Sequence, residues 1–501
     1  MPRKPACLMG IDSGTQSTTV GVWTTRGRRL ARAAAPLTVR TPRPGWAEQD
    51  PRLWWSSTRK AMRAAVEQVP NADIQAVGVA YQRETFTLVD GRGRFVRPGV
   101  LWLDVRADRE VEQAARDLGR SEYHQRTGKP LDVTSAVARL LWLRRHERAA
   151  LRQADRFADV GGCLAHKLTG RWATCVAGTD TCGLIDLATR GWAGAHLEYA
   201  GLPSTRMPDL IGPGEVIGPL SRRAARQTGL PEGLPVVAAG GDGQVFNVGM
   251  HAAGAFRMSL TLGTSIVLGL SCPAPVISPL CRTLIAASGR GYLLESVLQA
   301  GTYLLRWFVE RFGAPGETEA DWDRRIARIP PGCEGLVTLP NWWGVRFPQT
   351  LPDARGATLG WSNHHTAAHF YRSLLEGTSM ELRRLIEAYR ELFPRRVRRT
   401  IHAGGGGARS RPWTRILTDA TGCPVELPPE PEATALGAAV LAGVGIGRFP
   451  SVRAACAAMC RAPRRLGPDP ARRRTYRALF EDVYVPFLAQ TASLCGKLRG
   501  L

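Results

Sequence analysis

A group of residues suited to phosphate chemistry stands near the start of the chain. An apolar stretch at 7–11 leads into Asp12, a glycine and several hydroxyl side chains, and a second apolar stretch follows at 18–23. Glycine permits a tight turn whose backbone N–H groups donate to phosphoryl oxygens, and a carboxylate such as Asp12 can hold Mg²⁺ through water. The turn side chains that would contact the phosphates are Thr15, Gln16 and Ser17. An ordinary hairpin with a polar turn is the alternative.

Two further glycine turns follow much later, each after an apolar segment. The turn GGDG at 240–243 follows the segment 234–240, and four glycines at 404–407 follow the segment 399–403. Glycine lets a substrate approach the backbone, and a glycine run before a helix readily binds anions or nucleotides. Asp242 in the first of these turns is a candidate general base, although an aspartate in a glycine turn is more often structural.

Together with a strand-turn-strand around LGTS at 262–265, these turns resemble the phosphate-1, phosphate-2 and adenosine loops of the actin-like ATPase superfamily. In detail they resemble the FGGY family of carbohydrate kinases. The other landmarks are GWAEQDPRLWW at 45–55, AVGVAYQRETFTLVDGRG at 76–93, VLWLDVRAD at 100–108, ARGATLGW at 354–361 and EATALGAAVLAGVGIG at 432–447. Their joint order over most of the chain makes a chance resemblance improbable.

The resemblance implies an α/β fold in which two ribonuclease-H-like domains flank a central cleft. Glycine- and proline-rich stretches at 201–217 and 231–243 place the domain boundary near residue 246. This boundary gives an N-terminal domain at 1–246 and a C-terminal domain at 247–501. We expect strands near 7–11, 18–23, 76–80, 86–89, 234–240 and 399–403, and helices near 51–67, 106–118, 135–149, 297–312, 364–392, 411–421 and 432–445. Such alternation of strands and helices is typical of α/β layers.

The resemblance also assigns roles at the nucleotide side. It implies ATP and Mg²⁺ as cofactors, with Asp242 accepting the proton of the acceptor hydroxyl and Asp12 organising the metal through water. The remaining ATP-binding positions that match the family are Thr264, Gly301, Gly406, Gly407 and Arg411. For the threonine and the glycines taken alone, a satisfied turn or a flexible loop is an equal alternative.

The acceptor side rests on a QRE triplet after a strand and on an LWLD segment. The triplet resembles the glycerol kinase branch, in which Arg83 and Glu84 would read polyol hydroxyls, and the matching positions in LWLD are Trp102 and Asp104. An exposed Arg–Glu salt bridge is the alternative. Thr134 and Gly243 replace larger residues of glycerol kinases, and the C-terminal half is more similar to xylulokinases. We therefore expect a polyol or ketose larger than glycerol.

Composition limits the other functions. At 501 residues, with 44% apolar and 22% charged residues, the chain can build two ordinary domains. Apolar runs are too short for a membrane span or a secretory signal, and eleven scattered cysteines without a CxxC pair fit reduced, mostly buried thiols. We therefore expect a cytoplasmic protein that binds no membrane and acts on a small sugar or polyol, with a homodimer possible.

The formal charge of +24 is the unusual global feature. It is carried almost entirely by arginines, dispersed along the chain without interleaved aromatics or a recognition helix, so we expect solvated faces and no nucleic-acid partner. We predict an ATP-dependent carbohydrate kinase. One alternative is a catalytically silent nucleotide-binding relative acting as sensor or assembly partner; the other is a basic nucleic-acid-associated protein on the same fold.

Overall fold

The apolar segments of the first half assemble into a mixed six-stranded sheet. Side chains of successive strand residues point to opposite faces, and β1 buries Cys7, Met9 and Ile11 on one face and Leu8 on the other. Both faces are therefore covered. The central strands β1, β5 and β12 are parallel, and the outer strands are antiparallel to their neighbours. The order is β11 (Val216–Pro219), β12 (Pro235–Gly241), β5 (Asp73–Tyr81), β1 (Ala6–Ser13), β2 (Ser17–Thr24) and β3 (Arg29–Pro36).

Helices from distant parts of the sequence cover the two faces of this sheet. One face packs against α1 (Pro51–Glu67), α6 (Val160–Thr169) and α9 (Arg222–Thr228), and the other against α10 (Asp242–Gly249), α15 (Ala433–Gly445) and α16 (Val452–Met459). Helix α15 lies so close that a Cβ at Gly10 or Gly78 would fall 1.8 or 2.0 Å from a carbonyl oxygen of the helix. Glycines on β1 and β5 therefore allow this contact. We call the sheet and these helices the first body.

A second sheet repeats this topology. Strands β16, β14, β13, β19, β20 and β21 follow the same succession of antiparallel and parallel neighbours as β3, β2, β1, β5, β12 and β11, and β15 is added at one edge. The order is β15 (Arg282–Ile285), β16 (Tyr292–Leu298), β14 (Ile266–Cys272), β13 (Met258–Leu262), β19 (Ile401–Gly404), β20 (Val425–Leu427) and β21 (Arg464–Leu466). The two halves of the protein are thus built on one plan.

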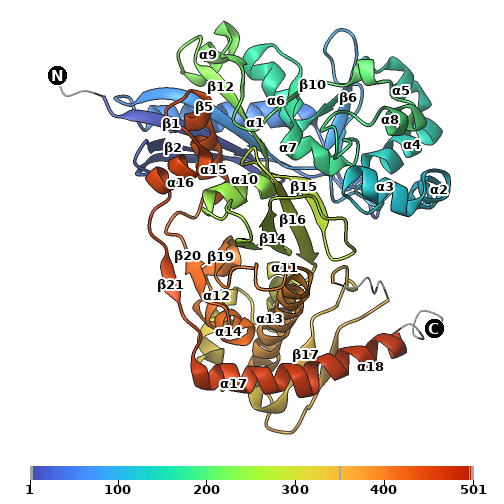
Figure 1. Cartoon of the computed structure of the whole chain (residues 1–501), viewed down its shortest axis with the longest axis vertical. Helices are drawn as coiled ribbons and strands as arrows, with labels where there is room; N and C mark the ends of the chain where they lie inside the picture. The colour runs from blue at the N-terminus through green and yellow to red at the C-terminus, as the bar shows by residue number, and fades with distance from the viewer. Residues whose placement is uncertain (1–3, 349–350, 352, 496, 498–501) are drawn as a thin grey trace.

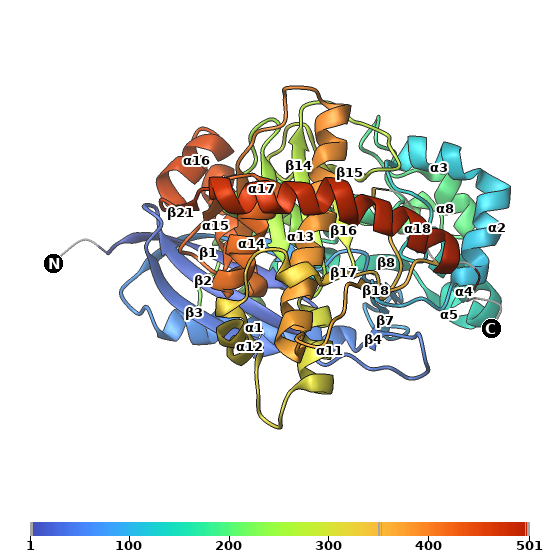
Figure 2. The same ribbon diagram turned by 90° about the horizontal axis from the view of Figure 1, so that it is seen from below.

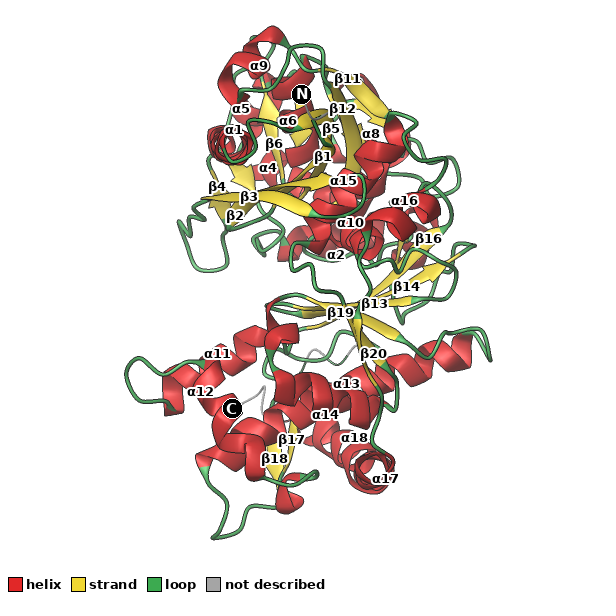
Figure 3. Cartoon of the chain, turned by 90° about the vertical axis from the view of Figure 1, so that its left-hand side faces the viewer, coloured by secondary structure: helices red, strands yellow, loops and turns green. Residues whose placement is uncertain are grey.

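The second sheet and its helices form the second body, which lies below the first in Figure 1. Its core joins the sheet to α11 (Thr302–Phe312), α12 (Glu319–Arg325), α13 (Ala367–Leu392), α14 (Arg411–Thr421), α17 (Pro470–Ala478) and α18 (Val485–Cys495). Figure 2 shows α17 and α18 running as one long rod across the base of this body, and Figure 3 shows a narrow junction between the bodies. A short hairpin adds β17 (Val337–Leu339) and β18 (Ala357–Leu359).

A smaller unit extends the first body beside the strand ends. It has a four-stranded sheet of β4 (Glu48–Gln49), β7 (Gly99–Val100), β6 (Phe86–Val89) and β8 (Arg156–Asp159). A separate core packs it against α2 (Asp108–Leu118), α3 (Arg120–Thr127), α4 (Ala136–His146), α5 (Arg148–Gln153) and α8 (Gly194–Ala200). The first half also contains α7 (Val176–Thr179) and the strand pair β9 (Ala173–Cys175) and β10 (Asp209–Ile211). Short 3-10 helices lie at 180–182, 204–206, 326–328, 333–335 and 406–409, and a π-helical segment at 479–484 joins α17 to α18.

The computed structural model describes residues 4–348, 351, 353–495 and 497, and within them it confirms the predicted α/β fold of two similar halves. One predicted element is wrong: 297–312 is not a single helix, because 292–298 is strand β16 and the helix starts at Thr302. The predicted helix at 135–149 is also divided, since α4 ends at His146 and α5 follows. The boundary near residue 246 stays a division along the sequence, because α15 and α16 pack on the first sheet.

Cysteines and membrane-spanning segments can be checked directly. All eleven cysteines are free thiols and only Cys460 is not fully buried, as expected. No helix in the described ranges combines the length and the apolarity that crossing a membrane needs.

Candidate active site

The three parallel strands of the first sheet bring the predicted chemical groups to one edge. Asp12 on β1 is level with Ala80 on β5, which is level with Gly240 on β12. Arg83 follows the end of β5, and Asp242 follows the end of β12 as the first residue of α10. Ligands bind at this carboxyl end in open α/β sheets.

Asp242 is held in place through one of its two carboxylate oxygens. Its Oδ1 accepts a hydrogen bond from the backbone N–H of Gly243 at 2.7 Å. The same oxygen lies 3.0 Å from Arg83 Nε, with which it forms an ion pair. The side chain keeps 37% of its surface exposed, so Oδ2 is the oxygen that an acceptor hydroxyl can reach. Burial raises the pKa of Asp242, and the positive charge of Arg83 opposes that rise. These opposed effects suit a general base.

Arg83 is the centre of an ion-pair network that joins the two bodies. Its Nη1 lies 2.8 Å from Glu295 Oε2 on β16, and Arg282 on β15 pairs with both Glu295 and Glu84. Glu295 is 1% exposed; burial would raise its pKa, but Arg83 and Arg282 hold the pKa at about 2. The hairpin β15–β16 of the second body therefore reaches into the predicted acceptor site. In place of the exposed Arg–Glu salt bridge that the sequence left as the alternative, Arg83 pairs with Asp242 and Glu295, and Glu84 pairs with Arg282.

Backbone strain and a buried arginine fix the segment around Glu84. Glu84 has φ +57°, in the left-handed region that a residue with a side chain rarely adopts. Arg139, on α4, donates to Glu84 O at 2.6 Å and to Trp102 O at 3.2 Å. In the structure it positions the backbone of two predicted acceptor residues.

Thr15 links the phosphate-1 hairpin to the acceptor side. Its Oγ1 accepts from Trp102 Nε1 at 2.9 Å and donates to Gln82 Oε1 at 3.2 Å. Gln16 is exposed at the tip of the same turn, and Ser17 is half-buried at the start of β2. The tryptophan is thereby fixed beside the turn, as a wall for a substrate requires.

Asp104 does not join this group. It is fully buried, and its carboxylate accepts from Ala47 N at 2.6 Å, from Arg106 N at 3.1 Å and from Arg106 Nε at 2.8 Å. Its charge is used inside the protein, where an unpaired carboxylate would be costly. The sequence-based assignment of Asp104 to substrate binding is therefore corrected to a structural role beneath the acceptor loops.

Asp12 has the environment expected of a carboxylate that awaits a cation. Its Oδ1 is buried and has no hydrogen-bond partner among the described residues. Burial, with the negative charges of Asp242 and Glu432, raises the pKa of Asp12 to about 8. A divalent cation would satisfy the orphaned oxygen and reverse the cause of the shift. The residues present therefore fit Mg²⁺.

The predicted nucleotide residues of the second body gather at the corresponding edge of the second sheet. Thr264 is exposed in the turn between β13 and β14. A Cβ at Gly301 would lie 2.4 Å from Gly263 O and 2.5 Å from Thr264 O, so this glycine is needed where α11 meets the turn. Leu298 pairs with Ile266 just after the turn, three residues along β16 from Glu295, which is ~10 Å of strand.

The glycine loop after β19 contains two positions of different character. Gly406 is exposed, and a Cβ there would meet nothing within 4 Å, so only a ligand would exclude a side chain. A Cβ at Gly407 would lie 2.5 Å from the Trp413 ring and 3.0 Å from Leu262 Cβ. Protein packing already requires the second glycine. Arg411 is exposed at the first turn of α14, beside the loop.

Several residues of the site escaped prediction. Arg282 and Glu295 come from strands that otherwise read as apolar, and a single charge inside such a strand was the signal available. Gln244 on α10 donates to Asp180 Oδ1 at 3.0 Å, and Asp180 also accepts from Lys129 Nζ at 3.0 Å. This buried chain supports the helix that begins at Asp242, and nothing in the local sequence pattern announces it.

The repeated sheets and the edge that carries Asp12 and Asp242 define a two-domain phosphotransferase of the actin-like ATPase class. Models of the N-terminal and C-terminal domains of the FGGY family of carbohydrate kinases match residues 7–249 and 258–446. The chain belongs to this family and is a carbohydrate kinase, for which ATP is the phosphoryl donor.

Individual relatives extend over the whole chain. A xylulose kinase of Escherichia coli K12 is 30% identical in an alignment of 498 residues that covers 96% of this chain and all of that protein. An autoinducer-2 kinase of Yersinia pestis is 28% identical, covering 94% of this chain and 92% of its own length. Among solved structures, a xylulose kinase from Rhodospirillum rubrum superposes with a TM-score of 0.89 at 26% identity, over 98% of this chain and all of the other.

Proposed function

We propose that this kinase transfers the γ-phosphate of ATP to a primary hydroxyl of a four- or five-carbon ketose or polyol, with Asp242 as the general base. The carrying observation is the placement of Asp242, half-exposed through one oxygen and clamped through the other, beside the Arg83 network. Asp242 would take the hydroxyl proton while the oxygen attacks phosphorus and the bond to the leaving ADP breaks.

The neighbouring residues would hold the two substrates in line. Arg83, Glu84 and Trp102 would orient the acceptor, since a guanidinium offers hydroxyls donors, a carboxylate offers them acceptors and an indole offers the carbon chain an apolar wall. The phosphates and adenosine would be contacted by Thr15, Gln16, Ser17, Thr264, Gly301, Gly406, Gly407 and Arg411. Asp12 would hold Mg²⁺, which neutralises phosphate charge when bound. ATP supply favours the cytoplasm as the place of this reaction.

The proposed size of the acceptor does not follow from Thr134 and Gly243, the two replacements on which the sequence-based expectation depended. The space left by Gly243 is not open, because a Cβ there would lie 2.8 Å from Arg83 Nη2. Thr134 donates to Asp132 Oδ1 at 2.6 Å and is engaged in its own turn. What supports a five-carbon ketose is the full-length similarity to a xylulose kinase. The autoinducer-2 kinase among the similar proteins supplies a competing acceptor.

A screen of acceptors by coupled ADP release tests the proposal. We expect D-xylulose or D-ribulose to give kcat/KM at least about tenfold above glycerol, equivalent to roughly 1.4 kcal/mol of transition-state binding. The panel of acceptors should also contain erythritol, gluconate and autoinducer-2. If gluconate, autoinducer-2 or glycerol gives the highest kcat/KM, the proposed substrate class is wrong and the kinase assignment stands.

A further inference from the structure

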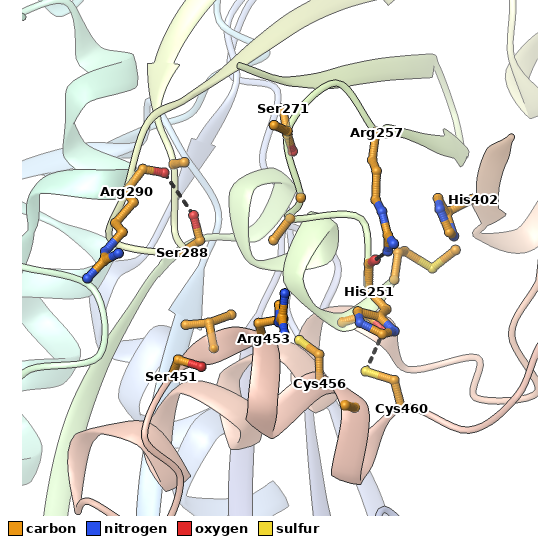
Figure 4. Close-up of a pocket in the computed structure, with 18 of the residues that line it drawn as sticks. His251, Arg257, Ser271, Ser288, Arg290, His402, Ser451, Arg453, Cys456 and Cys460 are labelled. Carbon is orange, nitrogen blue, oxygen red and sulfur yellow. Dashed lines mark hydrogen bonds between the residues drawn. The ribbon is translucent and has the colours of Figure 1, made fainter. Parts of the chain in front are cut away.

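A large cavity lies at the junction of the two bodies, away from the edge that carries Asp242. Its volume is about 1480 Å³, above the range of roughly 300–1,000 Å³ that is usual for small-molecule sites. Figure 4 shows His251, Arg257 and His402 gathered on one side of it, Arg290 on the opposite side, and Arg453 rising from α16 between them. None of the residues placed in the proposed catalytic site lines this cavity.

Every passage of the chain between the bodies runs along this cavity. The chain crosses from α10 to β13 at 250–257, returns from β20 to α15 at 428–432 and crosses again from α16 to β21 at 460–463. Met250, His251 and Arg257 of the first crossing, Pro428 and Glu430 of the second, and Cys460 and Arg461 of the third are all lining residues. A ligand in the cavity would therefore contact all three hinge segments together.

Positive charge dominates the lining. Five arginines from four segments face two carboxylates, and one of these, Glu430, is already paired with Arg29. The arginines are Arg257, Arg290, Arg398, Arg453 and Arg461. Across the residues that the structure describes, none of the five forms an ion pair within 4.0 Å. Their charge is thus unbalanced within a concave, partly enclosed space.

The two lining histidines add a donor without adding charge. Burial and the positive charge of Arg257 lower the pKa of His251, and the same causes lower that of His402 to about 4. Both rings are therefore neutral near pH 7. His402 Nδ1 lies 3.3 Å from Glu426 Oε2, which takes up the one N–H of that ring, so the N–H offered to a ligand is that of His251. Arginine forks bind phosphate oxygens in pairs, and cationic groups on several walls favour an anion that reaches more than one of them.

We propose that this cavity binds a small molecule carrying at least two phosphate groups, and that the bound anion restrains the hinge between the bodies. The inference does not depend on which sugar the kinase phosphorylates. Because phosphoryl transfer in a two-body enzyme needs closure around the substrates, such a ligand would act on the reaction from outside the catalytic edge.

Inorganic tripolyphosphate is a suitable probe, titrated by calorimetry at about 0.1 M salt with a non-hydrolysable ATP analogue kept saturating. The saturating analogue occupies the nucleotide loops, so binding must occur elsewhere. Arg453→Glu combined with Arg461→Glu should weaken tripolyphosphate binding at least about tenfold. The matched control is Arg223→Glu with Arg226→Glu, which makes the same charge change on two exposed residues of α9. An equal loss of affinity in both double variants, or unchanged affinity in the cavity variant, would overturn the proposal.

Hydrogen exchange locates the bound probe independently of catalysis. Tripolyphosphate should slow amide exchange in 250–257, 428–432 and 460–463 of the wild-type protein and not of the cavity variant. Protection confined to the loops at 263–265 and 405–409 would place the probe in the nucleotide site and refute the inference. Thermal unfolding of each variant confirms that the comparison is made between folded proteins.

Discussion

At the scale of single residues, the chemistry depends on how Asp242 is held. Replacing its carboxylate by an amide keeps the shape and the Gly243 contact but removes the proton acceptor. We expect Asp242→Asn to lower kcat by about two to four orders of magnitude and to leave ATP affinity near normal, because the proposed adenosine loop at 404–407 lies on the other body and an amide adds no bulk beside the phosphates. Steady-state kinetics with a separate nucleotide titration measures both quantities.

The control is Asp209→Asn, an exposed carboxylate of the first body with a side chain 71% exposed in its weak pair with Arg171. It should be indistinguishable from wild type in both measurements. Wild-type turnover in Asp242→Asn would remove Asp242 from the mechanism.

The raised pKa of Asp12 makes the stability of the protein depend on pH. Its folded-state pKa of about 8 lies above its unfolded value, so the folded protein retains a proton that the unfolded chain has lost between about pH 4 and pH 8. The free energy of unfolding contributed by Asp12 therefore falls as pH rises through that window. Asp12→Asn removes this loss. We expect the variant to gain at least about 1 kcal/mol over wild type at pH 8 and much less at pH 5.

Urea denaturation of both proteins at the two pH values, without Mg²⁺, measures this difference. The same substitution should abolish the metal-dependent part of the kinase activity, so stability is gained where function is lost. A variant that is less stable than wild type at pH 8 would show that burial does not penalise the Asp12 carboxylate.

At the scale of elements, the loop after β19 separates ligand contact from packing. Gly406→Val adds a side chain where the protein leaves open space, so it should raise the Kd for ATP at least about tenfold and leave the melting temperature nearly unchanged. Gly407→Val would drive a branched side chain into Trp413 and Leu262. It should lower the free energy of unfolding by roughly 1–3 kcal/mol, as overpacking does.

Nucleotide titration and thermal unfolding of the two variants distinguish these effects. If Gly406→Val leaves ATP binding intact, the loop does not lie against the nucleotide. If both variants lose stability equally, the distinction between the two glycines is wrong.

The family resemblance carried by the glycine turns predicted an α/β fold of two similar halves, and the pairing of β1, β5 and β12 is what brings Asp12 and Asp242 to one edge. The local sequence pattern did not predict features that depend on contacts with residues far away in the sequence. The apolar run at 292–298 matches a buried strand and a buried helix equally, and its pairing with β14 decides between them. Asp104 has the residue type and the spacing of a substrate-binding residue, but its carboxylate oxygens accept hydrogen bonds from Ala47 N and Arg106 Nε. Arg139 lies outside the motifs named above, and only the fold shows that it donates to Glu84 O.

At the scale of the whole molecule, the excess of arginine serves different purposes in different places. Arg83, Arg139 and Arg282 are buried or nearly so and organise the acceptor side. Others, such as Arg63 and Arg477, form exposed pairs one helical turn apart, which contribute little. A third set lines the hinge cavity. The high net charge is therefore divided among buried ion-pair networks, exposed pairs and the lining of the cavity.

The second body contacts the predicted acceptor site through the ion-pair network of Arg83, Arg282 and Glu295. Glu295 is the partner of both Arg83 and Arg282, so Glu295→Gln leaves two buried guanidinium groups short of one negative charge. We expect it to lower the free energy of unfolding by about 3 kcal/mol or more, whereas Glu67→Gln in an exposed pair should change it by less than about 0.5 kcal/mol.

A structural role alone would move only stability, and the pH profile adds a second readout. Glu295 raises the pKa of Asp242 by its charge and also competes with it for Arg83. Without that carboxylate, the pKa of Asp242 should fall. Because a general base works only when deprotonated, the acidic limb of kcat/KM against pH should move to lower pH in Glu295→Gln. A limb that stays in place, or moves to higher pH, would show that the second body supports the acceptor site without tuning its base.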